Sequence, residues 1–173
     1  MGSIAIQIAK TVAKLRVIAT ASRPETRQWC QDLGADDIVN HRQDLAEQVE
    51  QADYILCLNN TDMHWQAMTK IIKPQGMICS VVENQHSLNM ALLKSKSAGF
   101  VWEFMFTRAM YQTEDMEMQR ALLNAIATLV DNNTIKTTCN EIVNTINAEN
   151  LRQVHAKIEA GRSIGKTVLA GWG

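Results

Sequence analysis

Two short segments near the start of the chain carry groups that could bind phosphate. Gly2 and Ser3 open an expected helix, whose N-terminus would offer unpaired N–H groups and a partial positive charge to an anion. Ser22 and Arg23 follow an apolar run that ends at Thr20, and no Asp or Glu stands at that point. A hydroxyl beside a permanently charged guanidinium suits a phosphate. Two alternatives stay open: Ser3 as a plain helix cap and Arg23 as a surface charge.

Two further segments lie at the carboxyl ends of apolar runs that indicate buried strands. Residues 58–61 follow the run Ala52–Leu58, and residues 80–82 end the run Met77–Val82. Ligands of open parallel sheets bind outside the carboxyl ends of the strands, so both loops are expected to border a bound ligand. The pair Asn59-Asn60 also suits an ordinary turn, because Asn tolerates a left-handed backbone.

The remaining reactive residue types form no catalytic or metal-binding pattern. The four cysteines include no C-x-x-C pair, and the four histidines include no H-x-x-x-H or H-E-x-x-H pair. We therefore expect no metal site and assign no catalytic residue. His64, His86 and His155 are expected to be surface or hydrogen-bonded side chains. The aromatic cluster between Trp102 and Tyr111 favours core packing or subunit contact over substrate stacking.

Composition excludes several classes of protein. The chain has 173 residues with 17 basic and 18 acidic side chains, a formal charge of -1, so the basic excess of a nucleic-acid-binding module is missing. No apolar run approaches the roughly 18 residues of a membrane span, and no secretory signal opens the chain. We expect a cytoplasmic protein that binds neither nucleic acid nor membrane.

Helices and short strands alternate along the chain. Helices are expected over 3–15, 24–33, 44–51, 62–72, 113–131 and 148–160, and strands over 16–20, 36–40, 52–58, 77–82, 99–104, 136–144 and 166–170. Continuous apolar strands between helices indicate an α/β fold with a doubly wound parallel sheet and a C-terminal strand–helix–strand appendage. A Rossmann unit begins with a strand and a Gly-rich turn, so we expect this sheet to lack its first, central strand.

The segments GSIAIQIAK, VIATASRPET, LGADDIVNH, ADYILCLNNTDMHWQAM, IIKPQGMICSV and NAENLRQVHAKIEAGRSIGKTVLAGW follow one another in this order. Together they resemble the medium-chain dehydrogenase/reductase superfamily, in particular its zinc-type alcohol dehydrogenase-like and quinone oxidoreductase branch. The resemblance covers essentially the whole chain and implies the C-terminal, nucleotide-binding half of a two-domain enzyme. It implies a truncated Rossmann domain over 1–135 and a segment, 136–173, that returns to the catalytic domain in intact members. Any zinc ligands would lie in the other half, so no zinc is expected here.

The resemblance also implies a nicotinamide cofactor and places several residues beside it. Asn59 and Val82 would line the nicotinamide end, and His41, at the end of the strand over 36–40, would approach a 2′-phosphate. Lys166, in a Gly-Lys motif that could also be a simple turn, would approach an outer phosphate or the nicotinamide end. NAD-preferring Rossmann domains carry a carboxylate where this chain has Ser22-Arg23, so NADPH is favoured over NADH. The complete expected cofactor set is Gly2, Ser3, Ser22, Arg23, His41, Asn59, Val82 and Lys166.

These expectations lead to one main interpretation of function and to alternatives. The chain is interpreted as the cofactor-binding half of an NADPH-dependent oxidoreductase that transfers hydride to a small-molecule quinone, enone or carbonyl substrate. The alternative is a non-catalytic truncated fragment that only binds nucleotide or oligomerises. A methyltransferase-like fold fits less well, because its Gly-rich loop and its acid after the second strand are missing.

An absent central strand would also leave apolar sheet edges exposed. We therefore expect a homo-oligomer, or direct pairing of the strands at 16–20 and 52–58. Members of the resembled branch commonly dimerise through the strand expected at 99–104.

Overall fold

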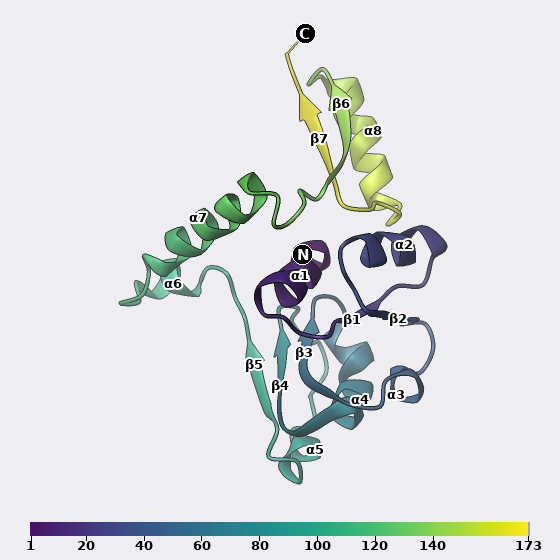
Figure 1. Ribbon diagram of the computed structural model, residues 1–173, viewed down its shortest axis with the longest axis vertical. Coiled ribbons are helices and arrows are strands. Elements are labelled where there is room, and N and C mark those ends of the chain that lie inside the picture. The colour runs from purple at the N-terminus through teal and green to yellow at the C-terminus, as the bar shows by residue number, and fades with distance from the viewer. Residues whose placement is uncertain (173) are drawn as a thin grey trace. The chain divides into compact units, whose positions relative to one another are not determined.

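The computed structural model describes residues 1–172 (Figure 1). The chain forms two compact units. The first unit consists of Met1, Thr20–Ser22 and Val39–Ala127. The second unit consists of Gly2–Ala19, Arg23–Ile38 and the segment from Thr128 onward.

The first unit is built on a three-stranded parallel sheet. Its strands are β3 (Ala52–Cys57), β4 (Ile72–Ser80) and β5 (Gly99–Trp102), in the order β3-β4-β5. The connecting helices are α3 (Leu45–Gln48), α4 (Thr61–Ile71), α5 (Ala91–Lys94) and α6 (Thr107–Tyr111). In each parallel crossover a helix returns the chain to the start of the next strand, as expected of a βαβ unit.

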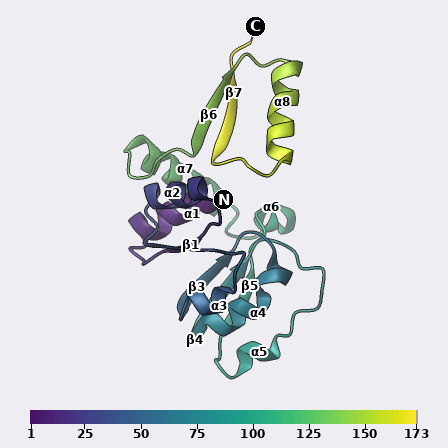
Figure 2. The same cartoon turned by 90° about the vertical axis from the view of Figure 1, so that its right-hand side faces the viewer.

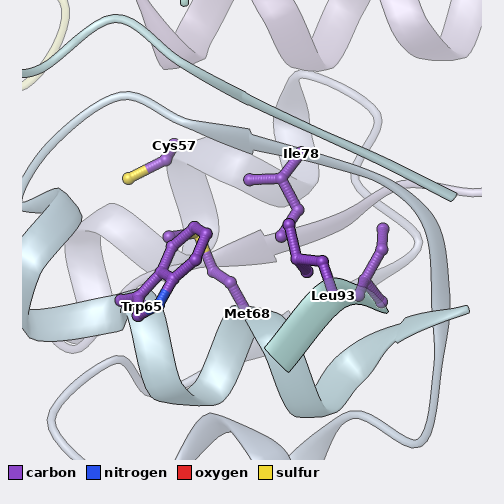
Figure 3. Close-up of a cluster of buried hydrophobic side chains, with 6 residues drawn as sticks. Cys57, Trp65, Met68, Ile78 and Leu93 are labelled. Carbon is purple, nitrogen blue, oxygen red and sulfur yellow. The ribbon is translucent and has the colours of Figure 1, made fainter. Parts of the chain in front are cut away.

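A compact apolar cluster joins α4 and α5 to this sheet (Figure 3). Trp65 and Met68 come from α4, Ile78 from β4 and Leu93 from α5, and each is nearly inaccessible to solvent. The Trp65 ring meets the edge of Phe100 on β5, with 5.5 Å between the ring centroids. This burial fixes α4 against the sheet and thereby sets the positions of the loops at both ends of the helix.

The second unit contains the N-terminal helix and the C-terminal strand–helix–strand segment. Helix α1 (Gly2–Gln7) continues into a π-helical turn over Ile8–Val12, and α2 (Pro24–Asp32) follows. At the C-terminal end, β6 (Cys139–Asn144) and β7 (Lys166–Ala170) form a parallel pair connected by α8 (Ala148–Glu159), which lies beside them (Figure 2).

Three elements contribute residues to both units. Strands β1 (Ile18–Thr20) and β2 (Asp37–Val39) pair with each other as a separate two-stranded sheet. Helix α7 (Met118–Asp131) has no buried residue, and its apolar side chains Leu122 and Leu123 are about 60% exposed.

The expected α/β architecture with parallel sheets is confirmed, and most predicted elements are present. The helix expected over 3–15 differs, because its second half is a π turn in which the Ala13 amide donates to the Ile8 carbonyl at 3.0 Å. Strand β4 begins at Ile72 rather than at the predicted Met77. The short helices α5 and α6 were not expected, since four or five residues show no periodic pattern.

The strands form three separate sheets, β1-β2, β3-β4-β5 and β6-β7. Within residues 1–172 no ladder joins β1 to β3, so direct pairing of these strands, one of the two expected alternatives, is wrong, and oligomerisation stays a prediction. A parallel Rossmann sheet places its first strand between them, and neither strand has another partner for that edge.

No helix among the described residues combines the length and apolar character needed to cross a membrane.

Candidate functional site

The ends of β1 and β2 bring two of the predicted phosphate-binding residues to one edge. The Ala21 amide, just after β1, donates to the carbonyl of Val39, the last residue of β2, at 2.9 Å. Ser22 and His41 therefore follow the ends of neighbouring strands. No carboxylate occurs between the end of β1 and the first residue of α2.

Hydrogen bonds to a side chain of α3 hold the turn that carries His41. Gln48 Oε1 accepts from the Asn40 amide at 2.8 Å, and Gln48 Nε2 donates to the Asn40 carbonyl at 3.0 Å. The Asn40 side chain accepts from the Arg42 amide at 3.0 Å, which closes the turn around His41. The backbone amide, the backbone carbonyl and the side chain of Asn40 are all hydrogen-bonded. The backbone that carries His41 and Arg42 is therefore constrained.

A cavity of about 210 Å³ opens beside this turn. It is lined by His41, Arg42, Gln43, Asp44 and Leu45 from the turn and the start of α3, and by Met63, His64, Gln66, Ala67 and Lys70 from α4. Asp44 Oδ1 accepts from the Ala46 amide at 2.9 Å, so this carboxylate caps α3. Burial, and next the positive charge of His41, lower the pKa of His64.

The predicted nicotinamide end lies at the carboxyl ends of β3 and β4. Two buried hydroxyls meet there: Thr61 Oγ1 lies 2.7 Å from Ser80 Oγ and also donates to the Val82 carbonyl at 2.5 Å. The Asn59 carbonyl accepts from the Cys57 thiol at 3.7 Å. The Cys57 thiol also lies 3.9 Å from Thr61 Oγ1, so the loop carrying Asn59 and the segment carrying Val82 belong to one hydrogen-bonded network, which brings these two predicted residues together.

In the second unit, α2 contacts the first turn of α1. Trp29 Nε1 donates to Ser3 Oγ at 3.0 Å, so one lone pair of the Ser3 hydroxyl is used while its own hydrogen stays available for an acceptor. Gly2 is the first residue of α1, as the sequence predicts. The buried amide of Gln7 holds this helix, since its Oε1 accepts from the Lys136 amide at 2.6 Å.

In the same unit, the turn between α8 and β7 carries Lys166 at one end and is contacted by Arg23 at the other. The Arg23 guanidinium donates to the carbonyls of Gly161 and Arg162 at 3.5 and 3.4 Å, at the long limit for hydrogen bonds. Between Arg162 and Lys166, Gly165 has a φ of +66°, and a Cβ there would lie 2.5 Å from the Thr138 carbonyl oxygen. The Gly-Lys turn therefore requires glycine, and it directs the Lys166 amide onto the same carbonyl at 2.7 Å.

Sequence reasoning missed two features of this site. It treated His64 as a surface or hydrogen-bonded histidine without a functional role, whereas the packing of α3 against α4 places His64 on the cavity lining with His41. It also placed Thr61 and Ser80 only within the loops expected to border a ligand and did not predict that their hydroxyls meet. Neither residue forms a spacing motif, and their contact depends on the register of two parallel strands, which a single sequence does not display.

Comparison with known proteins identifies the family to which the chain is similar. A family model described as zinc-binding dehydrogenase matches residues 33–169. The chain is similar to a zinc-type alcohol dehydrogenase-like protein of Staphylococcus aureus (strain COL), with 40% identity over 172 residues. The alignment covers 98% of this chain and 51% of that protein, so the chain spans about half the length of the curated relatives it matches.

Solved structures agree with this result. A candidate zinc-dependent alcohol dehydrogenase of Rhizobium etli CFN 42 superposes with a TM-score of 0.90 at 40% identity, over 99% of this chain and 52% of that one. An Escherichia coli quinone oxidoreductase complexed with NADPH superposes with a TM-score of 0.76 at 19% identity, over 98% of this chain and 53% of that one. At that identity the second match shows the fold alone. The resemblance to the medium-chain dehydrogenase/reductase superfamily that the sequence predicts is confirmed.

The residues present do not fit the metal that the family description names. Across residues 1–172, no three His, Cys, Asp or Glu side chains lie together in a way that could hold a metal ion. Tetrahedral zinc sites take three or four such ligands. The described residues therefore offer no ligand set for zinc.

Proposed function

This chain belongs to the zinc-binding dehydrogenase family, and we propose that it is the NADPH-binding half of an oxidoreductase that reduces a quinone, enone or carbonyl compound. The observation that carries the cofactor choice is the edge formed by β1 and β2. There Ser22 and Arg23 follow β1, where NAD-preferring Rossmann domains carry a carboxylate, and His41 and Arg42 follow β2.

The chemistry of this edge suits a 2′-phosphate. Arg23 has five guanidinium N–H donors, and its two contacts with the carbonyls of Gly161 and Arg162 are long. A phosphate oxygen would replace those weak contacts with charge-assisted hydrogen bonds, which are roughly twice as strong as neutral ones. In the first unit, Arg42 on the constrained turn after β2 offers a permanent positive charge beside His41.

The ends of β3 and β4 suit the nicotinamide. When bound, the cofactor would supply the hydride, from C4 of its nicotinamide ring, and the protein would hold the ring and exclude water. The Thr61–Ser80 hydroxyl pair fixes the backbone of Val82, and with it the face that this residue offers to the ring. In the second unit, the Ser3 hydroxyl and Lys166 would supply donors to phosphate.

A non-catalytic nucleotide-binding fragment remains the second candidate function. In that case the chain would use only its cofactor-binding residues, since none of its residues is assigned a catalytic role here. A cytoplasmic location is part of the proposal and is supported by the free thiols of all four cysteines, which suit a reducing compartment.

A binding titration tests the cofactor choice. We expect Arg23→Ala to weaken NADPH binding about tenfold, the loss of one charge-assisted contact, and to leave NADH affinity nearly unchanged. Isothermal titration calorimetry with both nucleotides measures this, and Arg152→Ala, an exposed arginine on α8, is the matched control. Equal weakening of NADPH and NADH would contradict the 2′-phosphate assignment.

Turnover separates the two candidate functions. Steady oxidation of NADPH in the presence of benzoquinone, followed by loss of nicotinamide absorbance, would support the oxidoreductase. Saturable NADPH binding without oxidation of NADPH by a quinone, an enone or an aldehyde would support the binding fragment.

A further inference from the structure

Two histidines from different elements line the cavity beside the β1–β2 edge. His41 stands on the turn after β2, and His64 stands on the second turn of α4. Both are half-buried, and they lie close enough for the charge of one to act on the other. An imidazole on a cavity wall can change the charge of the cavity near neutral pH, as few other side chains do without a perturbed pKa.

The other charges around the cavity are mostly positive. Arg42 approaches from the turn and Lys70 from the last turn of α4. Among the described residues that line the cavity, Asp44 is the only carboxylate, and one of its oxygens caps α3. Two further acids lie on the packed helices but outside the lining: Glu47 on α3, and Asp62 on α4, whose oxygens accept from the Gln85 and His86 amides. The cavity thus offers an anion several positive charges.

We propose that His64, on the cavity that it lines together with His41, is a proton-dependent determinant of cofactor specificity: it strengthens binding of NADPH, through the 2′-phosphate, but not of NADH, as the pH falls from about 8 to about 6.5. This inference rests on the proposed function, because it takes the ligand at this edge to be a 2′-phosphorylated adenosine. It assigns to His64 a role that its helical position alone does not indicate.

The direction of the effect follows from proton linkage. In the free protein, burial and the charge of His41 lower the pKa of His64, so its imidazole takes up a proton at a lower pH than an ordinary histidine does. A phosphate anion beside His64 favours the protonated imidazole and raises that pKa. NADPH binding therefore takes up a proton, and affinity rises as pH falls through the pKa of the complex. The gain ends below the pKa of the free protein, and protonation of the phosphate itself, near pH ~6, sets the lower limit.

Calorimetry on the 173-residue chain tests this directly. NADPH, NADH and adenosine 2′,5′-bisphosphate are titrated at both ends of the pH range, each in two buffers of different ionisation enthalpy. We expect the preference for NADPH over NADH to rise about fivefold on acidification, with net proton uptake for the two 2′-phosphorylated ligands only. In His64→Gln the rise and most of the uptake should disappear, while NADH affinity stays unchanged.

The control is His155→Gln, because His155 is an exposed histidine of α8 outside the cavity lining. It should keep both the pH dependence and the proton uptake. A wild-type preference that does not change with pH, or one that survives in His64→Gln, overturns the inference and leaves the 2′-phosphate site standing. Failure of all three nucleotides to bind overturns the inference and the proposed function together. Proton uptake by the wild-type chain decides the matter even if a variant folds poorly.

Discussion

Two buried hydroxyl side chains, those of Thr61 and Ser80, stabilise the carboxyl end of β4. Thr61 and Ser80 are at most 1% exposed, and the Thr61 hydroxyl serves both Ser80 Oγ and the Val82 carbonyl. We expect Thr61→Val to lower the free energy of unfolding by about 1–3 kcal/mol, because it leaves buried polar atoms without their partner. Urea denaturation measures the change. Thr61→Ser keeps the hydroxyl and should lose much less, and an unchanged midpoint for Thr61→Val would contradict the argument.

At the residue scale, a single sequence indicates which groups follow a strand but not which side chains meet in space. Ser22 was predicted from its place after a strand, a rule that needs only the order of elements, and Asn59 from the family resemblance; both stay predictions. The proximity of His64 to His41 depends on how α3 packs on α4, and the Thr61–Ser80 contact depends on the register of β3 against β4. Neither relation leaves a spacing signal in one sequence.

At the scale of elements, a lysine from a distant loop ends α4. Lys96 Nζ donates to the carbonyls of Thr69, Lys70 and Ile72 at 3.0, 2.7 and 2.7 Å, and so satisfies carbonyls that the helix leaves unpaired. We expect Lys96→Met to destabilise the fold by about 1–2 kcal/mol in urea denaturation. Lys94→Met, an exposed lysine of α5, should change stability little, and equal effects of the two substitutions would argue against the cap.

The segment formed by β6, α8 and β7 contains an ion pair whose strength depends on pH. Hydrogen bonds from Lys157 Nζ at 2.5 Å, and next from Thr167 Oγ1 at 2.9 Å, lower the pKa of Glu141. A carboxylate whose folded pKa is lowered stabilises the fold above its unfolded pKa, and this contribution is lost as pH falls through the folded pKa.

The thermal midpoint should therefore fall less steeply on acidification in Glu141→Gln than in the wild type. Melting curves recorded by circular dichroism from neutral to acidic pH measure the two slopes. Glu159→Gln, an exposed carboxyl at the end of α8, is the control and should follow the wild type. Parallel curves for the wild type and Glu141→Gln would exclude a role for this ion pair.

Elements whose ends carry local signals were predicted best. Strand β7 has the predicted bounds, and α2 begins at Pro24 and is followed by Gly34 with a φ of +100°, as its sequence indicates. Strand β4 was predicted five residues short, because Pro74 and Gly76 look like a loop although they lie in an irregular part of the strand, where the register against β3 shifts. The π turn after α1 preserves an apolar spacing close to that of an α-helix, so periodicity could not reveal it.

At the scale of the whole molecule, the class of fold followed from the alternation of elements, but the division into three sheets did not. Alternation of helix and strand specifies parallel neighbours, and the observed order β3-β4-β5 obeys it. The order leaves β3 and β5 as edges of their sheet, each with an exposed apolar side chain: Leu56 on β3 is 50% exposed, and Val101 on β5 is 45% exposed. Unpaired edges with apolar side chains favour association with another chain.

We therefore predict a homodimer in solution that is joined through β5, the shorter of the two edge strands and the one followed by the exposed Phe104 and Phe106. Size-exclusion chromatography with light scattering should give twice the chain mass of 19.4 kDa. Val101→Lys should shift the protein to a monomer, because a lysine on an edge strand blocks pairing with another strand, whereas Leu56→Lys should leave the dimer intact. The reverse result would move the interface to β3, and a monomeric wild type would rule out association at either edge, leaving the apolar side chains of β3 and β5 for another domain to cover.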